Sequence, residues 1–258
     1  RSSEEVIEYL NRLRTIAHYL GASDCKLQEG SMRVDVNISV REKSSEFFGT
    51  RIEIKNLNSF KAIIRAIAGE RERQIDLLES GYQVVQETRR WDDTKEYSYA
   101  MRSKEDIQDY RYFPDPDLPP VVINNEWIDR VCSSLPELQP EKQARYEMDF
   151  SLPAYDAAII TGSKYLADLF EQTVMLGGNP KKVSNWLMVE TLHLLKEHGE
   201  EPEQLRFSPK HLAKLIALAE EGSVNSTVAK EVFEKMYEEN VDPESYVEKH
   251  GLKTVNDA

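Results

Sequence analysis

The stretch Met32-Arg33-Val34-Asp35-Val36-Asn37-Ile38-Ser39-Val40-Arg41 alternates apolar and polar side chains without a break. Successive side chains of a β-strand point to opposite faces, so this alternation predicts a strand with one buried face and one polar face. Residues 50–55 repeat the pattern over a shorter length, after a loop through Phe48-Gly49. Two such strands joined by a short loop predict an antiparallel pair.

Helical spacing of apolar residues lies on either side of this pair. A capping box at Ser2 or Ser3 with Glu5 opens a first predicted helix, and Gly21 ends it. A second predicted helix follows Ser59 and ends at Ser80-Gly81. Residues 83–90 and 97–102 add two strand-like segments. The first part of the chain is therefore predicted to be an α+β domain built on an antiparallel sheet.

The rest of the chain is predicted to be all-α. Four prolines between Pro114 and Pro120 indicate a stiff, extended connection just before it. We expect three domains: residues 1–123 around the sheet, residues 124–206 as a helical domain, and residues 207–258 as a small helical tail. The expected helices are 126–134, 137–148, 163–176, 180–197, 209–220, 226–238 and 243–250.

The two ends of the chain predict that it is part of a longer protein. It opens on a helix cap without an initiator Met, and residues 254–258 form no closing element. We expect a missing preceding half and a truncated tail. No apolar run of about 20 residues and no signal peptide is present, so we expect a cytoplasmic protein without a membrane partner. Cys25 and Cys132 fit two reduced, inert thiols.

The net charge of -13 argues against bulk attraction to nucleic acid, but the charge is uneven. Residues 1–123 carry 19 basic and 22 acidic side chains, whereas residues 124–258 carry 14 and 24. Thirteen of the 16 arginines fall in the first part. Because arginine makes fixed, bidentate contacts to phosphates and carboxylates, the chemistry is expected there.

Polar residues of the two predicted strands share one parity and so one face. Arginine and lysine neutralise phosphoryl oxygens, and carboxylates hold a cation or orient a nucleophile, so this face could hold a metal-bound nucleotide. A solvated face of cross-strand ion pairs explains the pattern as well, and spacing does not separate the two. The residues are Arg33, Asp35, Asn37, Arg51, Glu53 and Lys55.

Two further segments carry polar groups that could contact an anion. At Lys55-Asn56-Leu57-Asn58-Ser59 a strand ends and a helix N-terminus follows, which suits an anion and equally suits a plain turn. Arg89, Arg90 and Arg102 lie around Trp91, as in an RNA or phosphate contact. Surface pairing of Arg89 or Arg90 with Asp92 or Asp93 remains the alternative.

Several signals bear on other function classes. The five histidines show no metal-ligand spacing, and no GxSxG or GxxxxGK[ST] motif occurs, which argues against a hydrolase nucleophile or a P-loop. Lys181 and Lys182 begin a predicted helix near Trp186. They could touch RNA backbone, while a helix face with a buried Trp is the alternative.

Four motifs together resemble the B subunit of the tRNA-dependent amidotransferases. The likeness continues through Leu152-Pro153-Ala154-Tyr155-Asp156-Ala157 and Asn185-Trp186, so it spans nearly the whole chain. Val34 departs from the cysteine expected in many relatives, which should be harmless for a small buried residue. The motifs are residues 29–41, residues 53–60, Gln86-Glu87-Thr88-Arg89-Arg90-Trp91 and Asp109-Tyr110-Arg111-Tyr112-Phe113-Pro114.

The resemblance implies a reaction and a set of partners. Such a subunit uses ATP and Mg²⁺ to activate the carboxylate of misacylated Glu-tRNA(Gln) or Asp-tRNA(Asn), and ammonia then displaces the phosphate. A glutaminase A subunit supplies the ammonia, and a small C subunit ties the two together. The first domain would be the latter half of a cradle. The family's metal ligands belong to the half before Arg1, so no metal ligand is assigned, and the 258-residue chain alone is expected to be inactive.

The resemblance also implies roles for particular residues. Arg33, Asp35, Asn37, Glu53 and Lys55 would be catalytic. The ATP and acyl-tRNA end would contact Arg51, Asn56, Asn58, Ser59, Arg89, Arg90 and Arg102. Because the helical part is acidic, tRNA would be held by local patches at Lys181, Lys182, Lys210 and Lys230. The alternative is a non-catalytic subunit that binds tRNA or serves assembly.

Overall fold

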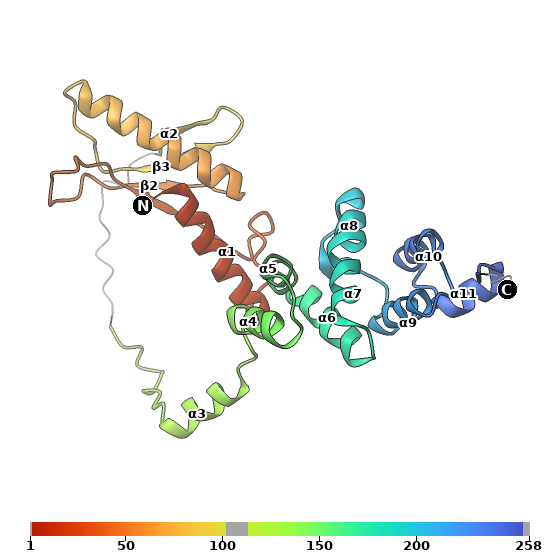
Figure 1. Cartoon of the computed structure of the whole chain (residues 1–258). Helices are drawn as coiled ribbons and strands as arrows, with labels where there is room; N and C mark the ends of the chain where they lie inside the picture. The colour runs from red at the N-terminus through yellow and green to blue at the C-terminus, as the bar shows by residue number, and fades with distance from the viewer. Residues whose placement is uncertain (1, 102–112, 255–258) are drawn as a thin grey trace. The chain divides into compact units, whose positions relative to one another are not determined.

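A computed structural model describes residues 2–101 and 113–254, which form two compact units. The first unit comprises residues 1–135 and the second residues 136–258. Figure 1 shows the course of the chain through both. This division does not separate a tail after residue 206; that boundary, like the one near residue 123, stays a prediction. No helix of the described residues is long and apolar enough to span a membrane.

The first unit is built on a four-stranded sheet, which confirms the α+β class. β1 (Val36–Ile38), β2 (Ile52–Lys55), β3 (Thr88–Asp92) and β4 (Tyr97–Ala100) lie in sequence order. β1 pairs with β2 antiparallel, as predicted, and β3 pairs with β4 antiparallel. β2 and β3, however, run parallel, so the sheet is mixed rather than wholly antiparallel. The long connection between β2 and β3 contains a helix, as a parallel crossover requires.

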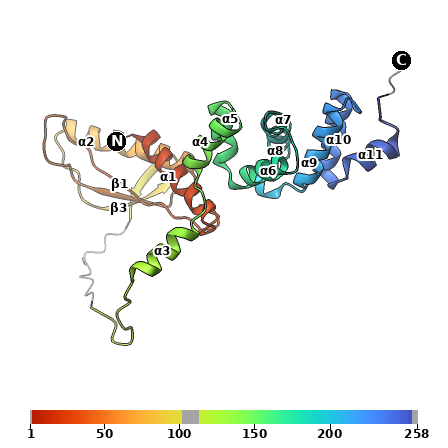
Figure 2. The ribbon, with the colours of Figure 1, turned by 60° about the horizontal axis from the view of Figure 1, so that its bottom comes forward.

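Two helices cover one face of this sheet. α1 (Ser3–Tyr19) begins at the predicted capping box of Ser2 and Glu5. α2 (Phe60–Glu79) begins where the Ser59 hydroxyl accepts a hydrogen bond from the Ala62 amide. α1 packs against α2, and Leu10 of α1 joins the same core as the residues of β2; Figure 2 shows both helices beside the strands. Their apolar residues and the inward side chains of β2 and β3 form one core: Leu10, Ile52, Ile54, Leu57, Ala62, Ile63, Ala66, Val84 and Trp91.

The alternating segment forms a shorter strand than its pattern predicts. Only Val36–Ile38 pairs in the sheet. Even so, from Met32 to Ile38 the residues alternate between partly buried and exposed. The polar residues of this segment therefore lie away from the core, as the alternation predicts. The last helix of the unit is α3 (Asn125–Ser134), which Asn124 caps.

The second unit is all-α in its described residues, as expected. Its helices are α4 (Gln139–Asp149), α5 (Ala154–Gly162), α6 (Lys164–Met175), α7 (Pro180–Asn185), η1 (Trp186–Thr191), α8 (Leu192–His198), η2 (Pro202–Gln204), α9 (Pro209–Glu220), α10 (Ser226–Glu239) and α11 (Pro243–His250). α9 and α11 have the predicted bounds. α5 was not predicted, because its apolar residues form no stripe along one side of the helix.

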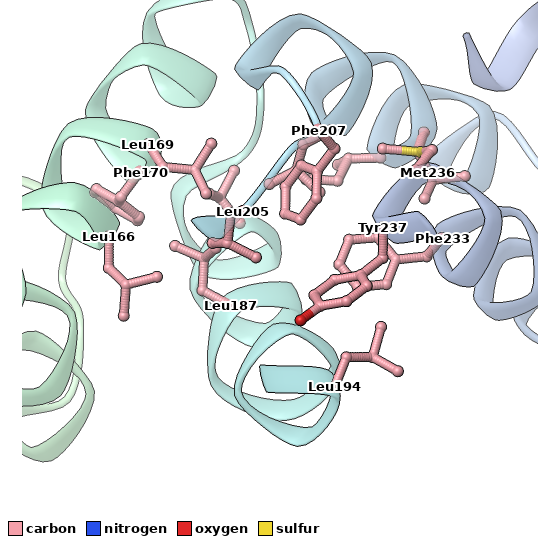
Figure 3. Packing of buried hydrophobic residues seen from close by; sticks show 14 of the residues in the cluster. Leu166, Leu169, Phe170, Leu187, Leu194, Leu205, Phe207, Phe233, Met236 and Tyr237 are labelled. Carbon is pink, nitrogen blue, oxygen red and sulfur yellow. The ribbon is translucent and has the colours of Figure 1, made fainter. Parts of the chain in front are cut away.

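The helix predicted over residues 180–197 contains a π-helical turn. η1 interrupts it between α7 and α8. Inside this wide turn the buried Thr191 hydroxyl donates to the Trp186 carbonyl at 3.1 Å. Aromatic rings pack against each other in the core of this unit: the ring centroids of Phe207 and Phe233 lie 5.2 Å apart. Figure 3 shows these rings with Tyr237 and Leu187. One apolar cluster thus runs from α4 to α11.

Candidate functional site: a cationic pocket on the open face of the sheet

A pocket in the first unit lies beside the face of the sheet that α1 and α2 do not cover, which we call the open face. Its volume is about 330 Å³. The segment before β1, the turn after β2, one residue of β3 and the residue that follows β4 form its wall. The lining residues are Leu27, Met32, Arg33, Val34, Asp35, Lys55, Asn56, Leu57, Asn58, Arg90 and Met101. Six predicted site residues therefore share one pocket: Arg33, Asp35, Lys55, Asn56, Asn58 and Arg90.

Strand register explains why residues distant in sequence meet there. Glu53 lies opposite Asn37 on β1 and opposite Thr88 on β3. Lys55 lies opposite Arg90 on β3. Because side chains directly opposite in a sheet share a face, these five residues lie on the face that α1 and α2 leave open. The parallel β2–β3 pair is what joins Arg90 to the residues of β1 and β2.

The pocket carries more positive charge than its carboxylates neutralise. Within the described residues, neither Arg33 nor Arg90 has an ion-pair partner. Lys55 Nζ lies 3.5 Å from Glu53 Oε1, and both side chains are partly exposed. The Thr88 hydroxyl donates to the other Glu53 oxygen at 2.9 Å. Two guanidinium groups therefore remain free to hold an anion, since arginine binds phosphate or carboxylate bidentately.

The turn after β2 fixes the floor of the pocket. Asn56 has a left-handed backbone, with φ of 69°, which asparagine tolerates better than most residues. Its side-chain amide donates to the Trp91 carbonyl at 3.0 Å, so it ties the end of β2 to β3. Ser59 is engaged in capping α2 and does not line the pocket. The exposed Asn58 side chain has no partner among the described residues and is available to a ligand.

Three more of the predicted residues, Asn37, Glu53 and Arg51, do not line the pocket. Asn37 and Glu53 lie one pair further along the strands. Arg51 is exposed just before β2. Arg102 lies outside the described residues. The pocket thus contains about half of the predicted residues. Asn37 and Glu53 lie further along the same face of the sheet.

Arg89 lies on the opposite, helix-covered face from Arg90. Its side chain is only 12% exposed. Nε of Arg89 donates to the Ser98 hydroxyl at 2.7 Å and lies 3.5 Å from a carboxylate oxygen of Glu70, and the guanidinium also pairs with Glu87. The structure therefore places Arg89 in a buried network and not beside the other predicted anion contacts.

Glu70 is the centre of that buried network. It accepts hydrogen bonds from Arg73 at 2.7 Å, from Gln74 at 2.9 Å and from Ser98 at 3.1 Å. Burial by itself would raise the pKa of Glu70, but the hydrogen bonds of Arg73 and Gln74 and the charge of Arg73 together bring the pKa below its ordinary value. Glu70 is therefore a buried, ionised carboxylate that holds β3 and β4 against α2.

The described residues contain no preformed cluster of metal-ligating side chains. No group of three His, Cys, Asp or Glu side chains among them is arranged to hold a metal ion. Of the carboxylates on the open face, Glu53 is already engaged by Lys55 and Thr88. We therefore assign no metal ligand to residues 2–101 or 113–254.

A second hollow, which we call the helical groove, lies in the second unit. Its volume is about 390 Å³. Lys182 and Lys230 both line it, beside the Trp186 ring. Lys230 Nζ pairs with Glu190 at 2.7 Å. Lys181 is exposed beside Lys182, and Lys210 is exposed at the start of α9. Two of the four predicted tRNA contacts thus share one groove.

Sequence reasoning missed the aromatic and π-helical features near these sites. Tyr97 and Tyr99 lie on the open face of the sheet, and their alternation with the buried Ser98 could have indicated this. Trp186 contacts Phe233, with ring centroids 5.1 Å apart, while also lining the helical groove. Trp186 is therefore partly buried against the core, as the buried-Trp alternative predicted, while contact of Lys181 and Lys182 with RNA stays a prediction. Nothing in the local pattern predicts the π-turn.

Comparison with known proteins extends these observations. A family model described as the GatB/GatE catalytic domain matches residues 1–129, and one described as the GatB domain matches residues 168–258. The B subunit of the aspartyl/glutamyl-tRNA(Asn/Gln) amidotransferase of Agathobacter rectalis is 63% identical over 257 residues, covering 100% of this chain and 54% of that protein. The protein of the same name from Caldicellulosiruptor bescii is 50% identical over 260 residues, with the same coverage. The chain spans about half the length of the curated relatives it matches.

Proposed function

Because this chain belongs to the GatB/GatE family, we propose that it serves the ATP-dependent amidation of misacylated tRNA. The side-chain carboxylate of Glu-tRNA(Gln) or Asp-tRNA(Asn) attacks the γ-phosphorus of ATP and forms an acyl phosphate, and ADP is released. Ammonia then attacks the acyl carbon and releases phosphate. The products are Gln-tRNA(Gln) or Asn-tRNA(Asn). The location we propose is the cytoplasm.

The observation that carries this proposal is the surplus of positive charge around the pocket. Arg33, Lys55 and Arg90 line it together, and the two arginines have no carboxylate partner within the described residues. Phosphoryl transfer is catalysed largely by positioning and by fixed positive groups that neutralise the phosphoryl oxygens. A cationic pocket beside exposed amide groups suits that chemistry.

The other pocket residues fit supporting roles. Asn58 offers an exposed amide that would hydrogen-bond the ester or the terminal ribose of the tRNA. Asp35, which is exposed on the same wall, would orient a neighbouring cationic group. Asn37 and Glu53 would act from the next row of the sheet, with Glu53 holding Lys55 in place. No step of this proposal passes through Mg²⁺.

The proposed partners follow from the name that the relatives carry. A protein named as the B subunit of an amidotransferase is one member of a multi-subunit complex. In our proposal a glutaminase A subunit supplies ammonia, and a small C subunit holds the complex together. The second unit would hold tRNA, and the helical groove with Lys182 and Lys230 supports this part of the proposal.

Substitution of the pocket cations in the assembled complex tests this function. We expect Arg33→Ala and Lys55→Ala each to lower ATP-dependent amidation by about a hundredfold or more, because each removes a fixed positive group from the phosphoryl site. Affinity for tRNA should stay unchanged. Lys43→Ala is the matched control, since Lys43 is exposed in the loop between β1 and β2 and does not line the pocket.

The opposite pattern would favour a different role. If turnover survives both substitutions while tRNA affinity falls, the subunit is a non-catalytic tRNA-binding or assembly component. Steady-state amidation and filter binding, measured on the same preparations, separate the two.

A further inference from the structure

Two tyrosines stand beside the cationic pocket on the open face of the sheet. Tyr97 is 49% exposed and Tyr99 is 39% exposed. Their ring centroids lie 6.1 Å apart, and the rings are tilted by 53°. Ser98 between them is buried on the other face, under α2. The core therefore does not account for the positions of these rings.

Strand register places Tyr99 in one row with two pocket cations. Lys55 lies opposite Arg90, and Arg90 lies opposite Tyr99. Neighbouring strands are about 4.8 Å apart, so Tyr99 lies about 10 Å from the strand that carries Lys55. Tyr97 lies opposite Asp92, one pair further along the same face. A phosphate held at Lys55 and Arg90 thus leaves the rest of its molecule within reach of the rings.

Packing between the strands is a weak explanation for this arrangement. A single exposed aromatic residue needs no explanation. Here, however, two rings adjoin each other, and the neighbouring Arg90 has no ion-pair partner within the described residues. An aromatic ring beside unneutralised cations is one combination by which proteins hold single-stranded nucleic acids, because the cations bind phosphate and the ring stacks on the base.

We propose that Tyr99, supported by Tyr97, stacks on the adenine base of a nucleotide whose phosphate groups lie at Arg33, Lys55 and Arg90. This inference rests on the proposed function and specifies its nucleotide site. The adenine belongs to ATP or to the 3′-terminal adenosine of the tRNA. Both sources present the same base to the same rings, and the experiment below distinguishes them.

The test compares ATP with inorganic tripolyphosphate, which has the phosphates but no base. Binding of each to the full 258-residue chain is measured by calorimetry. Loss of base stacking weakens binding about tenfold. We expect Tyr99→Ala to weaken ATP binding by that factor and to leave tripolyphosphate binding unchanged. Tyr99→Phe keeps the ring and should bind ATP as the wild type does.

Further variants and a further ligand complete the design. Tyr9→Ala is the matched control, because Tyr9 is 65% exposed on α1 and lies on a different element. Tyr97→Ala is the second test variant, expected to weaken ATP binding less than Tyr99→Ala. The trinucleotide CCA represents the tRNA terminus. If Tyr99→Ala weakens binding of CCA and not of ATP, the base belongs to tRNA and the stacking site stands.

The outcomes separate this inference from the proposed function. If the wild type binds ATP and tripolyphosphate while Tyr99→Ala and Tyr97→Ala change the affinity for neither ATP nor CCA, the stacking site is refuted and the cationic pocket stands. If the wild type binds neither ATP nor tripolyphosphate, the pocket itself is refuted, and the stacking site falls with it. Circular dichroism of each variant verifies that its fold is intact.

Discussion

Arg89 and Arg90 are neighbours in β3, yet their surroundings differ completely. Arg90 is exposed at the cationic pocket, whereas Arg89 is nearly buried against Glu70, Glu87 and Ser98. The alternation of a strand separates them, because consecutive side chains leave opposite faces. Consequently, one arginine is free to meet a ligand while the other holds β3 and β4 to α2. Removing a partner of a buried charge is costly, because the remaining charge cannot return to water.

The Glu70 network predicts a large stability effect from a residue that does not line the cationic pocket. We expect Glu70→Ala to lower the free energy of unfolding of the first unit by about 3 kcal/mol, since it leaves Arg89 with one fewer partner in a buried site. Urea unfolding measures this free energy, and hydrogen exchange of the backbone amides of α2 and β3 shows where the stability is lost. Glu72→Ala on the exposed side of α2 is the control and should change the free energy by less than about 0.5 kcal/mol. Equal effects of the two substitutions would contradict the network's role.

At the scale of elements, α9 and α11 are joined by a charged pair that also caps a helix. Lys214 Nζ on α9 lies 2.7 Å from Asp242 Oδ2. The other Asp242 oxygen accepts from the Ser245 amide at 3.1 Å, which caps α11. The hydrogen bond from Lys214 lowers the pKa of Asp242 from 3.8 to about 2. Burial opposes this with a smaller effect, and the hydrogen bond from the Ser245 amide acts in the same direction as Lys214. One ionised carboxylate thus links two helices.

This pair predicts how stability changes with pH. The pKa of Asp242 is lower in the folded state, so its contribution is complete above about pH 4 and is lost as the pH falls from about 4 to about 2. Asp242→Asn keeps a capping side chain but cannot titrate. The melting temperature of the wild type should therefore exceed that of Asp242→Asn at pH 5, and the difference should shrink toward zero near pH 2. A difference that does not vary with pH would refute the assignment.

At the scale of the whole molecule, the net charge of -13 opposes nucleic-acid binding, so our proposal assigns tRNA binding to local surfaces. The first unit carries a cationic pocket, and the second carries a groove with Lys182 and Lys230. In our proposal the two units divide the work, with chemistry at the pocket and grip on tRNA at the lysines. Lys230 is already paired with Glu190, so Lys182 is the freer of the two within the described residues.

This division predicts a distinct result for the lysines. We expect Lys181→Ala, Lys182→Ala, Lys210→Ala and Lys230→Ala to weaken tRNA binding by the complex and to reduce its salt slope by about 1 for each phosphate that is no longer neutralised. The KM for ATP should stay unchanged. Lys249→Ala, an exposed lysine on α11 that does not line the groove, is the control. An unchanged affinity and slope in all four variants would place the tRNA contacts elsewhere.

Much of the fold could be predicted where one element shows its own periodicity. α9 and α11 begin at a proline after a capping residue and have the predicted bounds. α5 was not predicted because its apolar residues form no one-sided stripe. The segment around Val36 reads as a strand of ten residues, but only three find a partner strand. The pairing depends on the neighbouring β2, which local periodicity does not describe.

The candidate site divides in the same way. Alternation indicated that Arg33, Asp35 and Lys55 leave the core, and the turn chemistry singled out Asn56 and Asn58. The parallel pairing of β2 and β3 placed Arg90 and Tyr99 next to the residues of β1 and β2, and no sequence pattern indicated that pairing. Arg89 could have been set apart, because it shares its parity with the buried Trp91.

The amino-acid sequence alone indicates which side chains of a helix or strand share a face, because that follows from the period of the element and the polarity of its residues. Which faces meet depends on how the whole chain folds. Contacts such as the one between Asn56 and the Trp91 carbonyl join residues far apart in the chain, and their geometry depends on the packing of the whole unit. The cationic pocket exists because of those long-range contacts.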